Sequence, residues 1–304
     1  MNKTHNLFYI ESPFQLMQVY EILTLQGNIK YKILIRLNHL NIGNQQLKNL
    51  VKVFRFNDVE YFPCNSNSMV RTKINLIALA IRTLRESLAS SDIYIGDENS
   101  IIFKLIRNFI GKDKIILLDD GVATLNTKLE NQLYRRFTIF KNGAMCNVNE
   151  FRNIGNFINR GTERNNVHLI VGSKFVEEGI ITRECYFKVL KKMIKTQDKN
   201  KDFIYVPHRG ESVDNLERIK NDLGLHVVKT SLPIEFIRYE LGIVPMTVHT
   251  ILSTSIFSMQ LIYKETGFIT YKVKDREILS RRQAILNLNK HFESIKNLTI
   301  IMVD

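Results

Sequence analysis

The sequence has no tryptophan, 5 prolines and 3 cysteines among its 304 residues. No apolar run approaches the roughly 18 residues of a membrane span, and the first residues lack the apolar core of a signal peptide. The cysteines, Cys64, Cys146 and Cys185, lie far apart and have no His or Cys at metal-ligand spacing. We therefore expect free thiols in a reducing cytoplasm, where they act as small buried hydrophobes.

Several short motifs with a known mechanism are also absent. The first expected strand is not followed by G-x-G-x-x-G, and the chain has no Walker loop, no H-E-x-x-H and no nucleophile elbow. Dehydrogenases, P-loop NTPases and the common hydrolases are therefore disfavoured.

What the chain does have is a globular composition with an excess of positive charge. Hydrophobic residues make up 44% and charged residues 24%, which excludes a disordered or fibrous chain. The length predicts about two domains. The formal net charge of +13 suggests an anionic partner: a nucleic acid, an anionic membrane face or a phosphate-bearing substrate. Charge alone does not choose among these.

Short apolar runs alternate with amphipathic stretches from end to end. The runs expected to form strands are 7–10, 32–37, 51–56, 92–95, 114–118, 167–171, 203–206, 225–228, 246–252, 268–273 and 298–303. The stretches expected to form helices are 12–26, 70–89, 182–195, 212–223, 233–241, 254–263 and 277–292. The first helix carries its own signals: Ser12 as N-cap, Pro13 at the first position, Gln15 completing a capping box, and Gly27 as the stop.

This alternation predicts an α/β fold with parallel sheets and crossover helices. A polar stretch, 147–166, interrupts it and divides the chain into two similar halves. We therefore expect two Rossmann-like domains facing a central cleft, an N-terminal domain over residues 1–160 and a C-terminal domain over 161–304.

Polar clusters follow four of the expected elements. In the first, Asp119 and Asp120 leave an apolar strand, and Gly121 permits a tight turn. One carboxylate beside another in a half-buried cleft can have its pKa raised enough to act as a general base. The alternative is an ordinary Asp-Gly turn.

The second cluster, His208 and Arg209, follows the strand 203–206. An imidazolium can donate a proton to a leaving phosphate, and a guanidinium can hold its charge with two hydrogen bonds. A loop histidine can equally be only solvated or packed.

The third and fourth clusters lie at helix starts. Ser253, Thr254 and Ser255 present three hydroxyls where one would suffice for capping, and a helix start with hydroxyls can bind phosphate. Glu235 could accept hydrogen bonds from ribose hydroxyls, although the helix dipole also favours a carboxylate there.

Taken in order, Asp119-Asp120-Gly121, His208 and Ser253-Thr254 resemble the three motifs of bacterial sialyltransferases of the GT-B type. The surrounding sequence is similar to the lipooligosaccharide sialyltransferases and capsular polysialyltransferases, most densely between residues 167 and 260. Arg209 stands where that family has proline.

The resemblance implies an inverting, metal-independent glycosyltransferase that moves sialic acid from CMP-sialic acid to a hydroxyl of a bacterial surface glycan. Asp119 would remove the acceptor proton, and Asp120 would tune Asp119 or hold the loop. His208 would protonate or hydrogen-bond the departing phosphate. Arg209, Ser253, Thr254 and Ser255 would hold that phosphate, Glu235 the ribose, and Gly172 and Ser173 would border the donor. No cofactor or metal is implied.

Other interpretations stay open at this point. The donor could be CMP-legionaminic acid, CMP-pseudaminic acid or CMP-Kdo, or the chain could be a basic nucleic-acid-binding module or an inactive glycan-assembly protein. The acceptor loops are expected within 38–70 and 122–165. For an enzyme, we expect no nucleic-acid partner, a cytoplasmic location, and peripheral contact with the anionic inner membrane through basic segments such as 188–201 and 276–282.

Overall fold

The computed structural model describes residues 5–38, 41–64, 68–96, 98–121, 124, 133–140, 146–159, 164–195 and 202–303. The chain forms two compact units, Met1–Phe157 and Ile158–Asp304. The sequence placed the domain boundary at residues 160 and 161. Parts of the expected acceptor loops and of the basic segment 188–201 lie outside the described residues.

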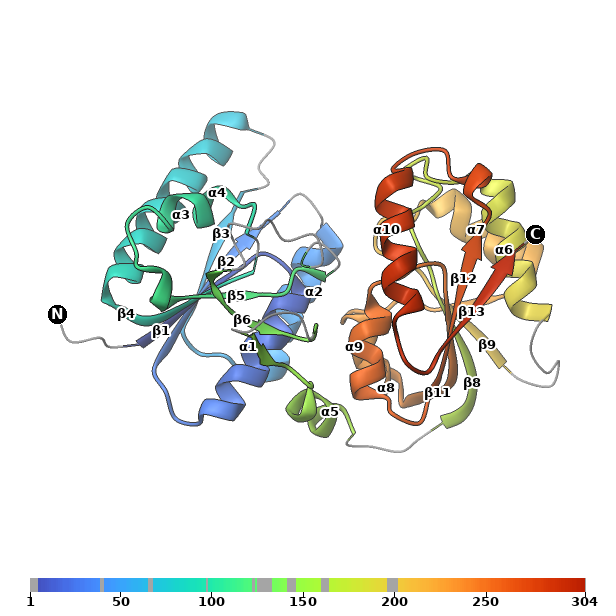
Figure 1. Ribbon diagram of the computed structural model, residues 1–304, viewed down its shortest axis with the longest axis horizontal. Helices are drawn as coiled ribbons and strands as arrows, with labels where there is room; N and C mark the ends of the chain where they lie inside the picture. The colour runs from blue at the N-terminus through green and yellow to red at the C-terminus, as the bar shows by residue number, and fades with distance from the viewer. Residues whose placement is uncertain are drawn as a thin grey trace. The chain divides into compact units, whose positions relative to one another are not determined.

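Unit 1 is built on a seven-stranded parallel sheet with the strand order β3-β2-β1-β4-β5-β6-β7. Its strands are β1 (His5–Ile10), β2 (Tyr31–Leu37), β3 (Val59–Pro63), β4 (Ser90–Ile95), β5 (Ile115–Leu118), β6 (Arg135–Thr138) and β7 (Cys146–Val148). Its helices are α1 (Pro13–Gln26), α2 (Asn41–Phe54), α3 (Met69–Ala89), α4 (Ile101–Ile106) and α5 (Arg152–Ile158). Helices α1 and α2 cover one face of the sheet, and α3 and α4 cover the other (Figure 1).

Unit 2 is built on a six-stranded parallel sheet with the order β10-β9-β8-β11-β12-β13. Its strands are β8 (Arg164–Val171), β9 (Asp202–Val206), β10 (His226–Val227), β11 (Ile243–Thr250), β12 (Gly267–Val273) and β13 (Leu298–Val303). Its helices are α6 (Arg183–Lys195), α7 (Val213–Leu223), α8 (Ile237–Leu241) with the 3-10 turn η4 (Ile234–Phe236) before it, α9 (Ser255–Ile262) and α10 (Arg282–Glu293). Helices α6 and α7 lie on one face, and α8 to α10 on the other (Figure 1).

The predicted fold class is confirmed, because both units are α/β with parallel sheets. The first helix is confirmed in detail: Ser12 and Gln15 form the capping box, Pro13 begins α1, and Gly27 ends it with a φ of 71°. Within the described part of the chain no helix is both long and apolar enough to cross a membrane.

The predicted strand at 51–56 is wrong, since these residues include the last turn of α2. The buried side chains of α2 are Leu47, Leu50, Val51 and Phe54. Their spacing of three, one and three residues is the period of a helix buried on one face. The apolar run over 51–56 overlaps the end of this longer helical pattern.

Strand order decides which loops come together. In unit 2, β8 lies between β9 and β11, so the loops that leave the carboxyl ends of these three strands are neighbours. The chain winds outward from β8 in both directions, and such a switch point is where open α/β sheets bind ligands. In unit 1 the loops after β1, β4 and β5 are neighbours in the same way.

The buried carboxylate of Glu21, on α1, caps the start of α5. Its Oε1 accepts hydrogen bonds from Asn153 N at 3.0 Å and Asn153 Nδ2 at 3.1 Å, and its Oε2 accepts one from Ile154 N at 3.0 Å. These backbone N–H groups belong to the first turn of α5, where no intrahelical acceptor exists.

We expect Glu21→Ala to lower the free energy of unfolding by about 2 kcal/mol, because it leaves buried donors without an acceptor. Urea unfolding measures the change. Glu150→Ala is the matched control, since Glu150 is exposed and, among the described residues, its ion pair is with the nearby Arg152. The control is expected to change stability by less than about 0.5 kcal/mol. Equal effects of the two substitutions would contradict the capping role.

Candidate functional site

Asp119 follows β5 and is fully buried, and two glutamine contacts fix its backbone. Gln18 of α1 accepts a hydrogen bond from Asp119 N at 3.0 Å and donates one to Asp119 O at 2.9 Å. The Asp119 carboxyl accepts a hydrogen bond from Ile139 N at 2.7 Å through Oδ2. Its Oδ1 makes no hydrogen bond with any described residue, so this oxygen is the one left to carry or take a proton.

Burial raises the pKa of Asp119 to about 7, against the opposing effects of hydrogen bonds from Thr138 and Ile139 N and of the nearby Arg136. The guanidinium of Arg136 is itself paired with Glu98 at 2.8 Å. A carboxyl group with a pKa near 7 is part protonated and part ionised at neutral pH. It can therefore both accept and donate a proton, as general acid–base catalysis requires.

Asp120 is held by the same helix. Gln15 donates to Asp120 Oδ1 at 2.9 Å, while its own Oε1 accepts from Glu11 N at 2.7 Å. A Cβ at Gly96 would clash with the Gln15 amide, so a larger residue there would displace this amide from its contact with Asp120. Gly121 has a φ of 63°, as the expected tight turn requires.

The sequence did not single out the polar group at the end of β1. Glu11 Oε1 accepts hydrogen bonds from Tyr9 Oη at 2.7 Å and Arg36 Nη1 at 2.6 Å. Burial, followed by the charge of Glu11, raises the pKa of the Tyr9 hydroxyl. The available signal was a carboxylate directly after an apolar strand, the same signal that identified Asp119.

In unit 2, one carboxyl group connects the loops after β8 and β9. Glu211 accepts hydrogen bonds from His208 N at 2.6 Å, from Tyr205 Oη, and from Tyr186 Oη at 3.3 Å. Tyr186 Oη in turn accepts one from Ser173 N at 3.0 Å. Burial raises the pKa of Glu211 to about 8.

Gly172 makes this network possible. A Cβ there would clash with the Glu211 carboxyl and the Tyr205 hydroxyl, so no other residue fits without moving the loop. The structure thus places Gly172 and Ser173 beside the His208 loop, and the role expected for them, to border the donor, stays a prediction. It also gives Gly172 a packing reason that the sequence did not reveal.

His208 is partly buried and lies in a positive environment. Burial, then the charges of Arg209 and Lys174, lowers the pKa of His208 to about 4, so the imidazole is neutral at pH 7. Its Nδ1 accepts a hydrogen bond from Gly210 N at 3.0 Å. The neutral ring therefore carries its proton on Nε2, where it can be donated to an anionic ligand.

The three hydroxyls at the start of α9 are close together. Ser253 Oγ and Ser255 Oγ are 2.9 Å apart, and Thr254, the N-cap residue, is exposed and forms no capping hydrogen bond through its side chain. The first N–H groups of α9 are thus not capped by Thr254. Ile256 N and Phe257 N donate to the backbone oxygens of Ser253 and Thr254, at 3.4 and 3.2 Å, so the hydroxyl groups at this helix start are the groups suited to bind an anion.

Glu235 is buried on η4, where its Oε1 accepts a hydrogen bond from Ser258 Oγ of α9 at 2.6 Å. Burial raises its pKa, while Ser258 and the charge of Arg209 oppose the rise. Arg209 therefore lies within electrostatic range of both Glu235 and His208. In unit 2 the structure brings together His208, Arg209, Glu235 and the start of α9, all at the carboxyl edge of the sheet.

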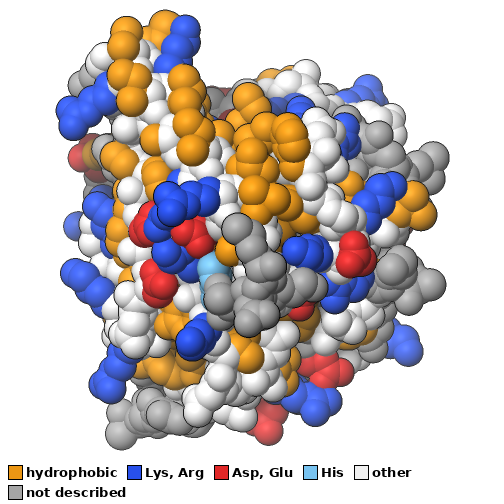
Figure 2. All heavy atoms as spheres, turned by 90° about the vertical axis from the view of Figure 1, so that its left-hand side faces the viewer, with side chains coloured by type: hydrophobic (Ala, Val, Ile, Leu, Met, Phe, Trp, Pro, Cys, Tyr) orange, Lys and Arg blue, Asp and Glu red, His pale blue; other side chains and the backbone are white. Residues whose placement is uncertain are grey.

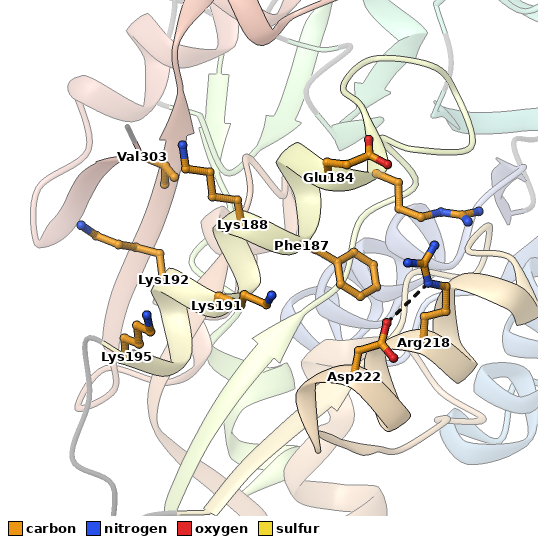
Figure 3. Close-up of a pocket in the computed structure, with 10 residues that line it drawn as sticks. Glu184, Phe187, Lys188, Lys191, Lys192, Lys195, Arg218, Asp222 and Val303 are labelled. Carbon is orange, nitrogen blue, oxygen red and sulfur yellow. Dashed lines mark ion pairs between the residues drawn. The ribbon is translucent and has the colours of Figure 1, made fainter.

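A separate groove of about 570 Å³ lies between α6 and α7 (Figure 3). Its cations are Arg183, Lys188, Lys191, Lys192, Lys195 and Arg218, and its carboxylates are Glu184 and Asp222. Arg218 Nε pairs with Asp222 at 3.5 Å and stacks its guanidinium on Phe187. The described part of the basic segment 188–201 lines this groove. None of the strand-end residues discussed above does.

No family model matches the chain, and no curated protein matches it in sequence. Solved structures do match. UDP-GlcNAc 2-epimerase of Methanocaldococcus jannaschii, in complex with UDP-GlcNAc and UDP, is 14% identical with a TM-score of 0.59, covering 98% of this chain and 89% of that chain. The Neisseria meningitidis UDP-GlcNAc 2-epimerase bound to UDP-GlcNAc is 11% identical with a TM-score of 0.54, covering 98% and 87%.

A Listeria monocytogenes structure assigned as a UDP-N-acetylglucosamine 2-epimerase is 10% identical with a TM-score of 0.65, covering 100% of this chain and 85% of that chain. At these identities the likeness shows the fold. The chain has the two-unit α/β architecture of the GT-B type.

The expected membership of the sialyltransferases is wrong, and with it CMP-sialic acid or a related CMP-sugar as the donor. The three solved structures described above, which cover 98 to 100% of this chain, are described as UDP-GlcNAc 2-epimerases, and two of them hold UDP-GlcNAc. The physical reason is that the three motifs mark strand ends, where this fold gathers polar groups whatever the nucleotide. Arg209, which stands where the sialyltransferases have proline, was the position at which the sequence departed from that family's motifs.

We expect Asp119→Asn to reduce the loss of stability as the pH rises. The carboxyl ionises near 3.8 in the unfolded chain and near 7 in the folded one, so the folded state keeps a proton that the unfolded state releases. The stability from the protonated form is full below pH 3.8 and is lost as the pH rises through 7.

Calorimetric melting of both proteins at about pH 5 and about pH 8 measures the effect. The wild type is expected to lose more stability than Asp119→Asn between the two conditions. Other groups, including Glu211, titrate in both proteins and cancel in the comparison. Parallel pH profiles would contradict a raised pKa at Asp119.

Proposed function

We propose that the protein is an enzyme that acts on a UDP-sugar, binding the nucleotide at the carboxyl edge of unit 2 and using Asp119 of unit 1 as a proton acceptor and donor. The observation that carries the proposal is the His208 loop. There a neutral imidazole with its proton on Nε2 lies in the electrostatic range of Arg209 and Lys174, at the switch point of a parallel sheet. This combination suits a diphosphate.

The remaining groups of unit 2 fit the same ligand. The start of α9, where Thr254 makes no side-chain cap, offers the hydroxyls of Ser253, Thr254 and Ser255 to phosphate oxygens. Glu235, fixed by Ser258, offers a carboxylate that can accept hydrogen bonds from ribose hydroxyls. Lys174 and Arg209 supply positive charge for the diphosphate, so we propose that the reaction needs no metal.

Among reactions of UDP-sugars, we favour epimerisation. An epimerase inverts a carbon by removing a proton from one face and returning one to the opposite face, so it needs acid–base groups that exchange protons near neutral pH, and Asp119 is proposed as one of them. The pKa of about 7 at Asp119 meets this requirement. The solved structures of similar fold that bind UDP-GlcNAc are 2-epimerases, which makes UDP-GlcNAc the first substrate to test.

UDP binding is expected to raise the pKa of His208 from about 4, because the diphosphate offsets the charges of Arg209 and Lys174. NMR titration of the His208 ring with and without UDP measures the shift. UDP at about 100 times its dissociation constant should also stabilise the fold by about 2.7 kcal/mol.

Arg209→Gln is expected to weaken UDP binding, whereas Arg218→Gln, which removes the same charge from the groove between α6 and α7, is expected to leave it unchanged. Stabilisation by CMP and not by UDP would overturn the nucleotide assignment. So would equal effects of the two arginine substitutions.

Incubation with UDP-GlcNAc, in the presence of EDTA, is expected to produce a second UDP-sugar, detected by its anomeric signal in the proton NMR spectrum. Asp119→Asn should lower the rate by at least about 10²-fold, the usual contribution of a general acid–base group. It should leave UDP binding unchanged, because Asp119 belongs to unit 1. UDP binding without any turnover of UDP-GlcNAc would overturn the epimerase assignment, and wild-type turnover by Asp119→Asn would remove Asp119 from the mechanism.

A further inference from the structure

Helix α3 exposes an apolar stripe along most of its length. The side chains are Val70, Ile74, Ile77, Ile81 and Leu88, which are 67%, 58%, 60%, 65% and 55% exposed. Their spacing of three, four and seven residues places them on one face of the helix. The opposite face, with Leu79, Thr83 and Ser87, is buried against unit 1. A surface helix normally turns polar residues outward, so this face indicates a binding partner.

Positive charge surrounds the apolar stripe. Arg71, Lys73 and Arg85 are exposed, and none of them forms an ion pair with a described residue. The only carboxylate of α3 is Glu86, which is mostly buried and pairs with Arg82 at 2.9 Å and Lys32 at 3.6 Å. Figure 2 shows this side of the molecule, where hydrophobic side chains gather in a band beside Lys and Arg side chains.

The neighbouring helix α4 has the same character. It packs against α3 on the same face of the sheet (Figure 1) and exposes Ile101, which is 66% exposed, and Lys104. Phe109, just beyond α4, is 62% exposed. The apolar and basic surface therefore extends beyond a single helix.

The charges decide which partner fits. A second copy of the chain would bring Arg71, Lys73 and Arg85 close to their own counterparts, with no exposed carboxylate on α3 to compensate. An anionic bilayer instead offers acyl chains for the apolar stripe and phosphate groups for the cations that border it. Helices with an apolar face and flanking Lys and Arg lie in this way at a membrane surface.

We propose that α3 docks unit 1 on the surface of a bilayer that contains anionic phospholipid, lying in the plane of the interface. The Ile side chains enter the boundary between headgroups and acyl chains, and Arg71, Lys73 and Arg85 contact lipid phosphates. This surface differs from the basic groove between α6 and α7, whose one aromatic side chain, Phe187, is only 9% exposed. The docking does not depend on which sugar nucleotide the enzyme uses.

The absence of tryptophan gives a direct test on the full chain. Ile77→Trp puts a single fluorophore in the stripe, and Val213→Trp, at an exposed position on α7, is the matched control. Vesicles of phosphatidylcholine with phosphatidylglycerol should shift the emission of Ile77→Trp to shorter wavelength and leave Val213→Trp unchanged. Vesicles of phosphatidylcholine alone should have a smaller effect. No shift for Ile77→Trp, or an equal shift for both, would overturn the proposal.

Vesicle flotation of variants separates the apolar contribution to membrane binding from the electrostatic contribution. Ile74→Gln/Ile77→Gln/Ile81→Gln should weaken binding by more than about tenfold, since each Ile loses its transfer from water. Arg71→Gln/Lys73→Gln/Arg85→Gln should also weaken it, whereas Lys188→Gln/Lys191→Gln/Lys195→Gln removes the same charge from α6 and should have little effect. Equal losses for the two charge variants would overturn the assignment to α3.

All of these substitutions lie at exposed positions, and unchanged melting temperatures will show that the variants fold. Analytical ultracentrifugation gives the remaining outcome. A wild-type dimer that the triple Ile variant abolishes, together with no binding to anionic vesicles, would show that the stripe serves self-association and would overturn the proposal. A wild-type monomer that binds these vesicles supports it.

Discussion

The buried carboxyl group of Glu211 holds together the segments that form the candidate nucleotide site. It accepts hydrogen bonds from His208 N and from the hydroxyls of Tyr205 and Tyr186, and Tyr186 also accepts one from Ser173 N. A loop that leaves a buried parallel strand carries backbone N–H groups that water cannot reach, and each needs an acceptor. Without this carboxyl group the loops after β8 and β9 would lose their shared support, and His208 its fixed position.

Unit 1 meets the same requirement with neutral amides. Gln18 satisfies both backbone groups of Asp119, and Gln15 contacts Asp120. A lysine or arginine could also have held this loop, but its charge would have stabilised the carboxylate and lowered the pKa of Asp119. Because the supporting amides carry no charge, burial remains the largest effect on the pKa of Asp119. This pKa therefore reaches about 7 although Arg136 is nearby. The two glutamines of α1 therefore support the acid–base role proposed for Asp119 as well as the fold.

Local signals in the sequence were enough to predict most helices and strands. The capping box of α1 and the alternation after residue 167 predicted their elements because both act over a few residues. The strand predicted over residues 51–56 was wrong because this segment overlaps the last turn of a helix whose apolar pattern starts earlier in the sequence.

The sequence could not predict the hydrogen-bond network of Glu211. Its partner Tyr186 lies 25 residues away, and only the fold brings the two side chains together. The nucleotide was misjudged for a different reason: hydroxyls, His and carboxylates at strand ends fit a phosphate and a ribose, which all sugar nucleotides share.

The net charge of +13 can be interpreted only from the side chains that lie beside the cations on each surface. At the His208 loop, burial and then the charges of Arg209 and Lys174 lower the pKa of one partly buried ring, so the charge of these two cations acts on a small site. Between α6 and α7 the cations alternate with Glu184 and Asp222 around a largely covered Phe187, which leaves a polar, solvated surface. On α3 the three exposed cations Arg71, Lys73 and Arg85 flank exposed Ile side chains, and the helix has no exposed carboxylate, so desolvation and charge attraction favour the same partner. Positive charge therefore occurs on three surfaces with different chemistry, and the exposed apolar side chains beside the cations of α3 are what favour a membrane as the proposed partner there.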